Sequence, residues 1–279
     1  MHDAPTASPD LLTLNAGPAV AVVDPAGGGR LAALSVAGVE LLMPGAGFGS
    51  FPMAPWCGRL AGGVLRSAGR FHRFPREAPP HAIHGTVRNS PWRVVRAAAD
   101  SALLEHGLGA PWPFAGRVTQ EFALSPSCLR LAMTVESHGE PFPAQAGWHP
   151  WFRRDLGTGG PAELRLAAAW QEERGPDHLP TGRRIAPREG PWDDCFGMPD
   201  GVAVTVDWPG ALTLEITSSA RWVVIYDEPA EALCVEPQSG PPNGLNTLPR
   251  PVTPRSPLTV TSTWHWSPPA GQADEGQLR

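Results

Sequence analysis

The chain has 279 residues, a formal net charge of −5 and a pI of about 6.0. It contains no lysine, which excludes Schiff-base lysine chemistry and a P-loop lysine. No cluster of basic residues predicts a nucleic-acid partner, and no apolar run reaches the roughly 18 to 20 residues of a membrane span.

The cysteines do not form a metal-binding or disulfide pattern. The four are Cys57, Cys128, Cys195 and Cys234, without a C-x-x-C pair and without a histidine at metal-ligand spacing. The first residues are polar and lack the apolar segment of a signal peptide. We therefore expect a cytoplasmic protein with reduced thiols, no metal and no cofactor.

Proline and glycine, 34 and 31 residues, are scattered along the whole chain and leave little room for long helices. Between them lie short runs with alternating or β-branched residues, which predict at least ten strands. Such a chain is typical of a single all-β sandwich or barrel, here residues 11–268, with disordered ends at 1–10 and 269–279. The predicted strands are 19–23, 31–42 (two strands around a turn at Gly38), 92–95, 102–105, 118–124, 129–136, 202–208, 212–218, 222–226 and 258–266.

Two polar segments in the first third of the chain are candidates for a binding site. Arg59 follows Trp56 and Gly58 in a proline-fixed loop, where its planar guanidinium suits a polyhydroxy or anionic ligand. A structural ion pair is an equal alternative. His84 is followed by Gly85, which permits a positive φ or a close backbone approach. Taken alone, His84 is more typical of a structural histidine, and His81 and His72 are expected to face solvent.

Two later segments are candidates for acid and base groups. His149 is flanked by Trp148, Pro150 and Trp151, and aromatic neighbours would shift its pKa by desolvation. A buried, satisfied histidine is the alternative. Glu236 ends an apolar strand before a Pro/Gly-rich loop, where burial would raise its pKa toward the range of a general base. A strand-end ion pair is a comparable explanation for this glutamate.

Together and in this order, six segments resemble the aldose 1-epimerase family. Its pattern has an Arg loop, His-Gly with a later Trp, an aromatic-proline segment, Gly-x-His-Pro, an Asp before an aromatic residue, and a late Glu-Pro. Three positions depart from it: Gly58 replaces Asn, Trp151 replaces Tyr, and Thr86-Val-Arg-Asn89 follows His-Gly. The matching segments are Trp56–Arg59, Ile83–Gly85 with Trp92, Pro111–Phe114, Gly147–Phe152, Asp193–Phe196 and Val235–Pro237.

The resemblance implies a galactose-mutarotase-like β-supersandwich that interconverts the anomers of a free sugar without a cofactor. Carried over by position, Glu236 would be the general base on the anomeric hydroxyl and His149 the general acid on the ring oxygen. Arg59, His84 and Asp193 (or its neighbour Asp194) would hold the sugar hydroxyls or ring oxygen, with Trp112 and Trp151 packing on the sugar. Such a protein would be a monomer or homodimer with a small-molecule sugar as its partner.

Three alternatives remain open at the level of sequence. A hexose-6-phosphate 1-epimerase would need arginines that converge on a phosphate, with Arg59, Arg66, Arg70 and Arg88 available. A non-catalytic sugar-binding module would not need both His149 and Glu236. A metal-dependent cupin-like barrel would use His81, His84, His149 and Glu236, although histidines three residues apart on a strand face opposite sides.

Overall fold

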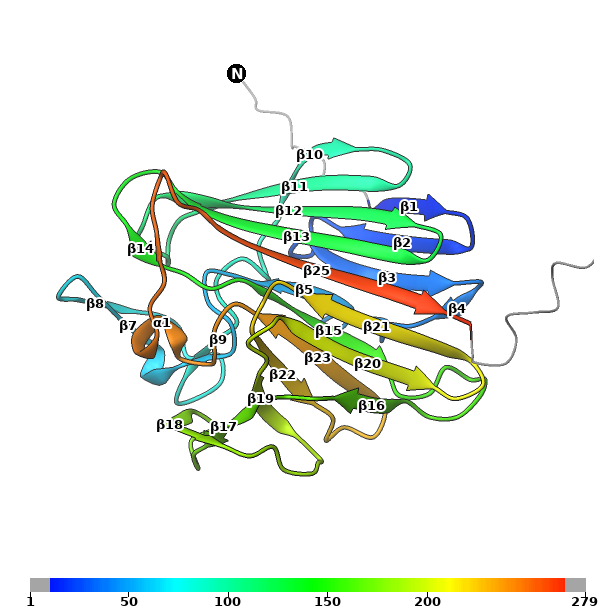
Figure 1. The fold of residues 1–279 in the computed structure, drawn as a ribbon. Coiled ribbons are helices and arrows are strands. Elements are labelled where there is room, and N and C mark those ends of the chain that lie inside the picture. The colour runs from blue at the N-terminus through cyan, green and yellow to red at the C-terminus, as the bar shows by residue number, and fades with distance from the viewer. Residues whose placement is uncertain (1–10, 269–279) are drawn as a thin grey trace, which may run out of the picture.

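Two large antiparallel sheets pack face to face in the computed structural model (Figure 1). The structure describes residues 11–268, so the ends predicted to be disordered lie outside the described residues. The longer sheet has eleven strands in the order β1-β2-β3-β5-β15-β23-β22-β19-β17-β18, with β4 beside β3. Its strands are β1 (Leu12–Ala16), β2 (Ala19–Asp24), β3 (Arg30–Val36), β4 (Val39–Glu40), β5 (Ser50–Met53), β15 (Gly147–Arg153), β17 (Trp170–Arg174), β18 (Pro180–Ile185), β19 (Asp193–Gly197), β22 (Trp222–Tyr226) and β23 (Ala232–Gln238).

The shorter sheet has eight strands in the order β10-β11-β12-β13-β25-β21-β20-β16. They are β10 (Arg93–Ala97), β11 (Ser101–Leu108), β12 (Gly116–Ser125), β13 (Cys128–Ser137), β16 (Glu163–Leu166), β20 (Val202–Trp208), β21 (Leu212–Ser218) and β25 (Leu258–Ser267). Three two-stranded pairs complete the strands: β6 (Arg59–Leu60) with β9 (Ala82–Ile83), β7 (Val64–Ser67) with β8 (Arg70–Arg73), and β14 (Phe142–Pro143) with β24 (Pro251–Val252).

In the described part of the chain, helix is confined to two short segments, the 3₁₀ turn η1 (Ala61–Gly63) and α1 (Gly244–Thr247). No helix within residues 11–268 is long and apolar enough to span a membrane.

The all-β prediction is confirmed, and several strands lie where the alternating pattern predicted them. Strands β20, β21 and β22 have the predicted bounds, and β12 and β13 form the predicted hairpin, with Ser125 opposite Cys128. The two strands expected around Gly38 are β3 and β4, and Gly38 has a φ of 82°. Alternation is clearest where one face of a strand meets the core and the other meets solvent.

The main core lies between the two large sheets. On β15, Trp148 points toward the shorter sheet, where its Nε1 donates to Gln120 Oε1 of β12 at 2.7 Å. The ring of Phe152, four residues further along β15, packs against Trp264 of β25 with centroids 5.2 Å apart. Because successive side chains of a strand point to opposite faces, His149 and Trp151 must lie on the outer face of the longer sheet.

Two loops that cover this outer face are fastened to each other. The Gln145 side chain accepts a hydrogen bond from Cys57 N at 3.2 Å and donates to Pro241 O at 2.9 Å. Asn243 N donates to Arg59 O at 2.7 Å, and its Oδ1 accepts from Ala61 N at 3.2 Å. The loop after β5 and the loop after β23 therefore form one rigid rim beside the sheet.

Candidate active site

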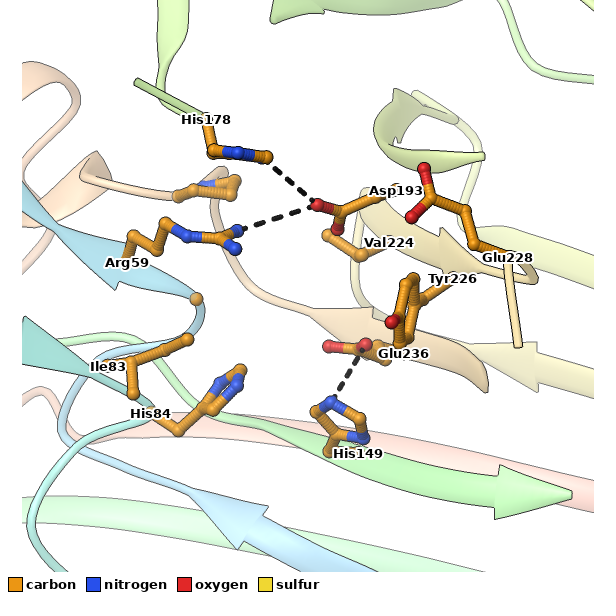
Figure 2. Close-up of a pocket in the computed structure, with 12 residues that line it drawn as sticks. Arg59, Ile83, His84, His149, His178, Asp193, Val224, Tyr226, Glu228 and Glu236 are labelled. Carbon is orange, nitrogen blue, oxygen red and sulfur yellow. Dashed lines mark ion pairs between the residues drawn. The ribbon is translucent and has the colours of Figure 1, made fainter. Parts of the chain in front are cut away.

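A cavity of about 350 Å³ lies on the outer face of β23, β22 and β19, under the β6–β9 pair (Figure 2). Five residues singled out from the sequence line it: Arg59, His84, His149, Asp193 and Glu236. They come from segments up to 177 positions apart, and the sheet order brings their strands together. A volume of this size lies at the lower end of the range for small-molecule sites.

A carboxyl–imidazole pair lines the cavity. Gly147 pairs with Gln238 and Trp151 with Cys234, so His149 of β15 lies opposite Glu236 of β23. The His149 Nε2 and Glu236 Oε1 atoms are 3.2 Å apart, and the two residues are only 6% and 3% exposed (Figure 2). Both nevertheless line the cavity, so a ligand there would contact a proton-transfer pair that is largely shielded from solvent.

Two aromatic rings stack against the imidazole of His149. The ring centroid of Phe51 lies 4.5 Å from that of His149 and the centroid of Trp151 lies 5.1 Å from it, and each ring is inclined by 26°. The sequence predicted that Trp148 and Trp151 flank this histidine, and the Trp148 half of that prediction is wrong, because Trp148 faces the core. Phe51 of β5 takes its place, since β5 pairs with β15 directly opposite His149.

Burial moves the pKa values of the pair in opposite directions. Desolvation raises the pKa of Glu236 well above 4.5; the nearby Asp193 carboxylate adds to this and the Arg59 guanidinium opposes it. Desolvation, assisted by the charge of Arg88, lowers the pKa of His149 from 6.5 to about 3. A low-dielectric site disfavours the charged form of each group. Burial therefore favours an uncharged carboxyl beside an uncharged imidazole.

His84 lies edge-on to this pair in a turn with an unusual backbone. Its ring is 5.0 Å from that of His149 at an angle of 89°. His84 has a φ of 61° and Gly85 one of 77°, and a Cβ at Gly85 would lie 1.9 Å from Ala54 O. Only glycine fits such an approach, which is the role expected of Gly85. Burial, and then the charges of His149, Arg88 and Arg59, hold the pKa of His84 well below 6.5.

The opposite wall of the cavity is a charged cluster centred on Asp193. Its Oδ2 lies 3.0 Å from Arg174 Nη1. The same oxygen lies 3.4 Å from His178 Nδ1 and 3.8 Å from Arg59 Nη1 (Figure 2). The sequence left open whether Asp193 or Asp194 contacts the ligand; Asp193 lines the cavity, whereas Asp194 is buried and lies 3.4 Å from Arg174 Nε. Arg59 and Asp193 thus offer a donor and an acceptor side by side.

Three further cavity residues, His178, Tyr226 and Glu228, did not stand out in the sequence. Tyr226 is the one tyrosine of the chain and ends a strand that was predicted, but its position beside Asp193 depends on the pairing of β22 with β19. His178 belongs to the turn between β17 and β18, and nothing in its local sequence indicates a site.

The aromatic residues proposed for sugar packing lie elsewhere. Trp112 is 2% exposed and packs in the core against Trp56, Phe74, Phe114 and Phe142, so its assignment as a substrate contact is corrected. The Pro-rich segment around Trp112 gave no alternation from which its burial could be predicted. Trp151 is partly exposed and packs on His149, but it is not among the residues that line the cavity.

The two histidines expected to face solvent do not. His81 is 5% exposed; its Nδ1 accepts from Gly62 N at 3.1 Å and its Nε2 lies 3.0 Å from Asp177 O. His72 is half-buried. With both ring nitrogens in backbone hydrogen bonds, His81 does not join His84, His149 and Glu236 in the ligand set of a cupin-like site.

Another set of side chains is close enough to hold a metal ion. One ligand atom each of His149, Cys234 and Glu236 lies within 4.8 Å of the others. Imidazole, thiolate and carboxylate are ligands that zinc accepts. Cys234 faces the cavity side of β23 because it is two residues from Glu236.

Comparison with known proteins agrees with the resemblance in the sequence. The galactose mutarotase-like protein from Clostridium acetobutylicum is 17% identical, with a TM-score of 0.82 over 92% of this chain and 94% of that one. An aldose epimerase homologue from C. elegans is 16% identical, with a TM-score of 0.79 over 93% and 99%. A galactose mutarotase-like protein from Lactobacillus casei is 15% identical, with a TM-score of 0.79 over 92% and 100%.

At these identities the solved structures establish the fold, which is the galactose-mutarotase-like sandwich predicted from the sequence. No functionally curated protein matches the chain. The family model described as aldose 1-epimerase matches residues 10–253, and the chain therefore belongs to the aldose 1-epimerase family.

Proposed function

We propose that the protein interconverts the α and β anomers of a free aldose by acid/base ring opening and closure. The observation that carries this proposal is the buried pair of His149 Nε2 and Glu236 Oε1, 3.2 Å apart in a cavity of about 350 Å³. Mutarotation requires one group that takes a proton and one that gives a proton across a single C–O bond. It requires no nucleophile and no redox group.

In the proposed mechanism Glu236 removes the proton of the anomeric hydroxyl while His149 protonates the ring oxygen. The C1–O5 bond breaks, the anomeric hydroxyl becomes the aldehyde oxygen, and the aldehyde carbon can rotate. Ring closure reverses both transfers: His149 takes the O5 proton and Glu236 returns a proton to O1. The pair thus alternates between carboxylate with imidazolium and carboxylic acid with neutral imidazole, and no net proton is consumed.

The bound sugar must favour the charged forms of Glu236 and His149, which burial disfavours. Desolvation favours the uncharged pair, as the raised pKa of Glu236 and the lowered pKa of His149 indicate. The closed sugar ring requires the ionised pair. Arg59 lowers the pKa of Glu236, and sugar hydroxyls that donate to the carboxylate would act in the same direction. We propose that Arg59, His84 and Asp193 hold the sugar so that these hydrogen bonds form.

Trp151 is assigned a different role from the one first expected. Together with Phe51 it fixes the plane of the His149 ring, which sets the direction in which Nε2 points. An acid that is held in place contributes more than one that must be oriented in the transition state.

Polarimetry of freshly dissolved α-glucose and α-galactose, with and without the protein, tests the proposal. We expect the approach to the equilibrium rotation to accelerate in proportion to protein concentration, and Glu236→Gln to abolish the acceleration. A sugar-binding module without catalysis would bind the sugar, detected by calorimetry, and leave the rate of mutarotation unchanged. That result would overturn the proposal.

A further inference from the structure

The outer face of β23 carries a cysteine next to the proposed base. Cys234 lies two residues before Glu236, so both side chains point to the same face of the sheet. One ligand atom each of Cys234, Glu236 and His149 lies within 4.8 Å of the other two. Within residues 11–268 no other group of three such side chains is this close. The proposed mechanism uses the carboxyl and the imidazole and leaves the thiol without a role.

The spacing of the three ligand atoms is close to that of a tetrahedral zinc site. With Zn–N and Zn–O distances of about 2.0 to 2.2 Å and a Zn–S distance of about 2.3 Å, two ligands of one ion lie about 3.3 to 3.6 Å apart. His149 Nε2 and Glu236 Oε1 are already 3.2 Å apart. The thiol of Cys234, at most 4.8 Å from the other two ligand atoms, needs to move by roughly 1 Å, a displacement within reach of side-chain rotation.

An ion would reach the thiol from the cavity. Cys234 has no exposed surface of its own, and its partners on β15 and β22, Trp151 and Tyr226, flank it on the same face of the sheet. His149 and Glu236, in contrast, line the cavity. An ion bound between these two would complete its protein ligands with the sulfur and would keep one coordination position open toward the cavity.

The chemistry of the three ligands fits a divalent ion that accepts sulfur. Coordination requires a thiolate and a carboxylate, so binding of the ion releases the protons of Cys234 and Glu236 to solvent. The two anions then balance the charge of the divalent ion, and His149 binds as a neutral imidazole. Thiolate favours zinc over magnesium and calcium, which prefer oxygen ligands.

We infer that His149, Cys234 and Glu236 form an inhibitory zinc site, at which the ion competes with the sugar. The inhibition rests on the proposed function, because the ion would occupy the two groups that transfer protons. With zinc on the imidazole of His149 and on the carboxylate of Glu236, neither a proton donor nor a free base remains. Mutarotase activity would therefore respond to the concentration of free zinc.

Initial rates of mutarotation over a range of sugar concentrations, in metal-free buffer and at fixed free zinc, test the inference. We expect zinc to raise the apparent KM and leave kcat unchanged, EDTA to reverse this effect, and magnesium or calcium to have none. Cys234→Ser should keep its kcat in metal-free buffer. It should need about 10- to 100-fold more zinc for half-inhibition, since even a group that acts on a metal site through a ligand contributes this much to affinity.

The matched control is Cys195→Ser. Cys195 is buried as well, and burial followed by the charges of Glu172 and Glu236 raises the pKa of its thiol well above 9.0. It therefore lies near the same glutamate, but it is not one of the three ligand residues. Zinc should inhibit Cys195→Ser as it inhibits wild type. Cobalt(II) reports ligation directly: wild type and Cys195→Ser should show a thiolate-to-cobalt charge-transfer band that Cys234→Ser lacks.

The absence of this band in wild type, or equal zinc inhibition of wild type and Cys234→Ser, would overturn the inference. Inhibition that lowers kcat without raising KM would overturn it too, because such an ion does not compete with the sugar. So would acceleration by zinc, since three protein ligands with an open position are also the pattern of a catalytic zinc site. The failure of the proposed function looks different: metal-free protein would accelerate the mutarotation of no sugar, whereas the cobalt band would persist.

Discussion

Both faces of β15 and β23 are buried, but one face packs in the core and the other lines the cavity. Trp148 and Phe152 of β15, and Leu233 and Val235 of β23, face the shorter sheet and form the core. One position away on the same strands, His149 and Glu236 line the cavity. In the core, buried apolar side chains are stabilised by packing against one another. At the cavity, burial instead shifts the pKa values of Glu236 and His149. Exposure alone therefore does not separate core from site here; the face of the strand does.

The most direct test of this difference between the faces is to substitute one residue on each face of β23. Glu236→Gln should lower kcat by about 10² to 10⁴-fold, because glutamine keeps the shape but cannot accept the O1 proton. Sugar binding should persist. Leu233→Ala on the core face should instead lower the free energy of unfolding by about 2 to 5 kcal/mol and leave the folded fraction active.

Polarimetry and denaturant unfolding of both variants measure the two effects. Near-wild-type kcat in Glu236→Gln would refute the assignment of the base. A severe activity loss in folded Leu233→Ala would show that the two faces are coupled.

On β15 the two faces can be compared in the same way, with the proposed general acid His149 on the cavity face and Trp148 on the core face. His149→Asn should lower kcat by about 10²-fold, since it removes an interaction made in the transition state. His84→Asn should also raise KM, because His84 is proposed to hold the ground-state sugar. Trp148→Phe, on the core face, leaves the buried Gln120 Oε1 without its donor and should cost about 1 to 3 kcal/mol of stability with kcat unchanged. A change of KM alone in His149→Asn would mean that the two histidine roles are exchanged.

The pH dependence of stability sharpens the comparison further. The folded protein binds the Glu236 proton more tightly than the unfolded chain does, because the pKa of Glu236 is raised above 4.5. Its contribution to stability is thus complete below pH 4.5 and is lost as the pH rises through the raised pKa. Glu236→Gln does not titrate, so its stability relative to wild type should increase between pH 5 and pH 9. Urea unfolding at both pH values measures this difference.

His149 acts in the opposite direction. Its pKa is lowered to about 3, so the stability it contributes is lost as the pH falls from 6.5 toward 3. This titration occurs in wild type and in Glu236→Gln and largely cancels between them. A relative stability that is independent of pH would contradict a raised pKa at Glu236.

Metal removal should have the smallest effect. Prolonged dialysis against EDTA is expected to leave mutarotase activity unchanged, because the proposed steps are proton transfers between side chains and sugar. His149, Cys234 and Glu236 are close enough to hold an ion, which makes this a direct test of the pair as an acid and a base. A large loss of activity that zinc restores would replace the proton-transfer mechanism by a metal-dependent one.

The local sequence predicted much of the fold and part of the site. Strands with one solvent-facing side, such as β20 and β21, show the alternation that predicts them. Strand β23 is buried along its whole length, so no alternation marks its two faces. The segments around Trp112 and Trp151 also lack alternation, so the sequence could not distinguish Trp112 in the core from Trp151 beside His149.

What the sequence determined by itself was the all-β class, the turn geometry at Gly85 and the residue types needed for acid/base chemistry. Those properties depend on the period of the strands and on local backbone sterics, which act over a few residues. The tertiary structure alone decided that β15, β23, β22 and β19 are neighbours and that Phe51, not Trp148, stacks on His149. The order of strands depends on packing between distant segments. That packing brings His178, Asp193 and Tyr226 to one wall of the cavity. It also buries the His149–Glu236 pair on the other wall.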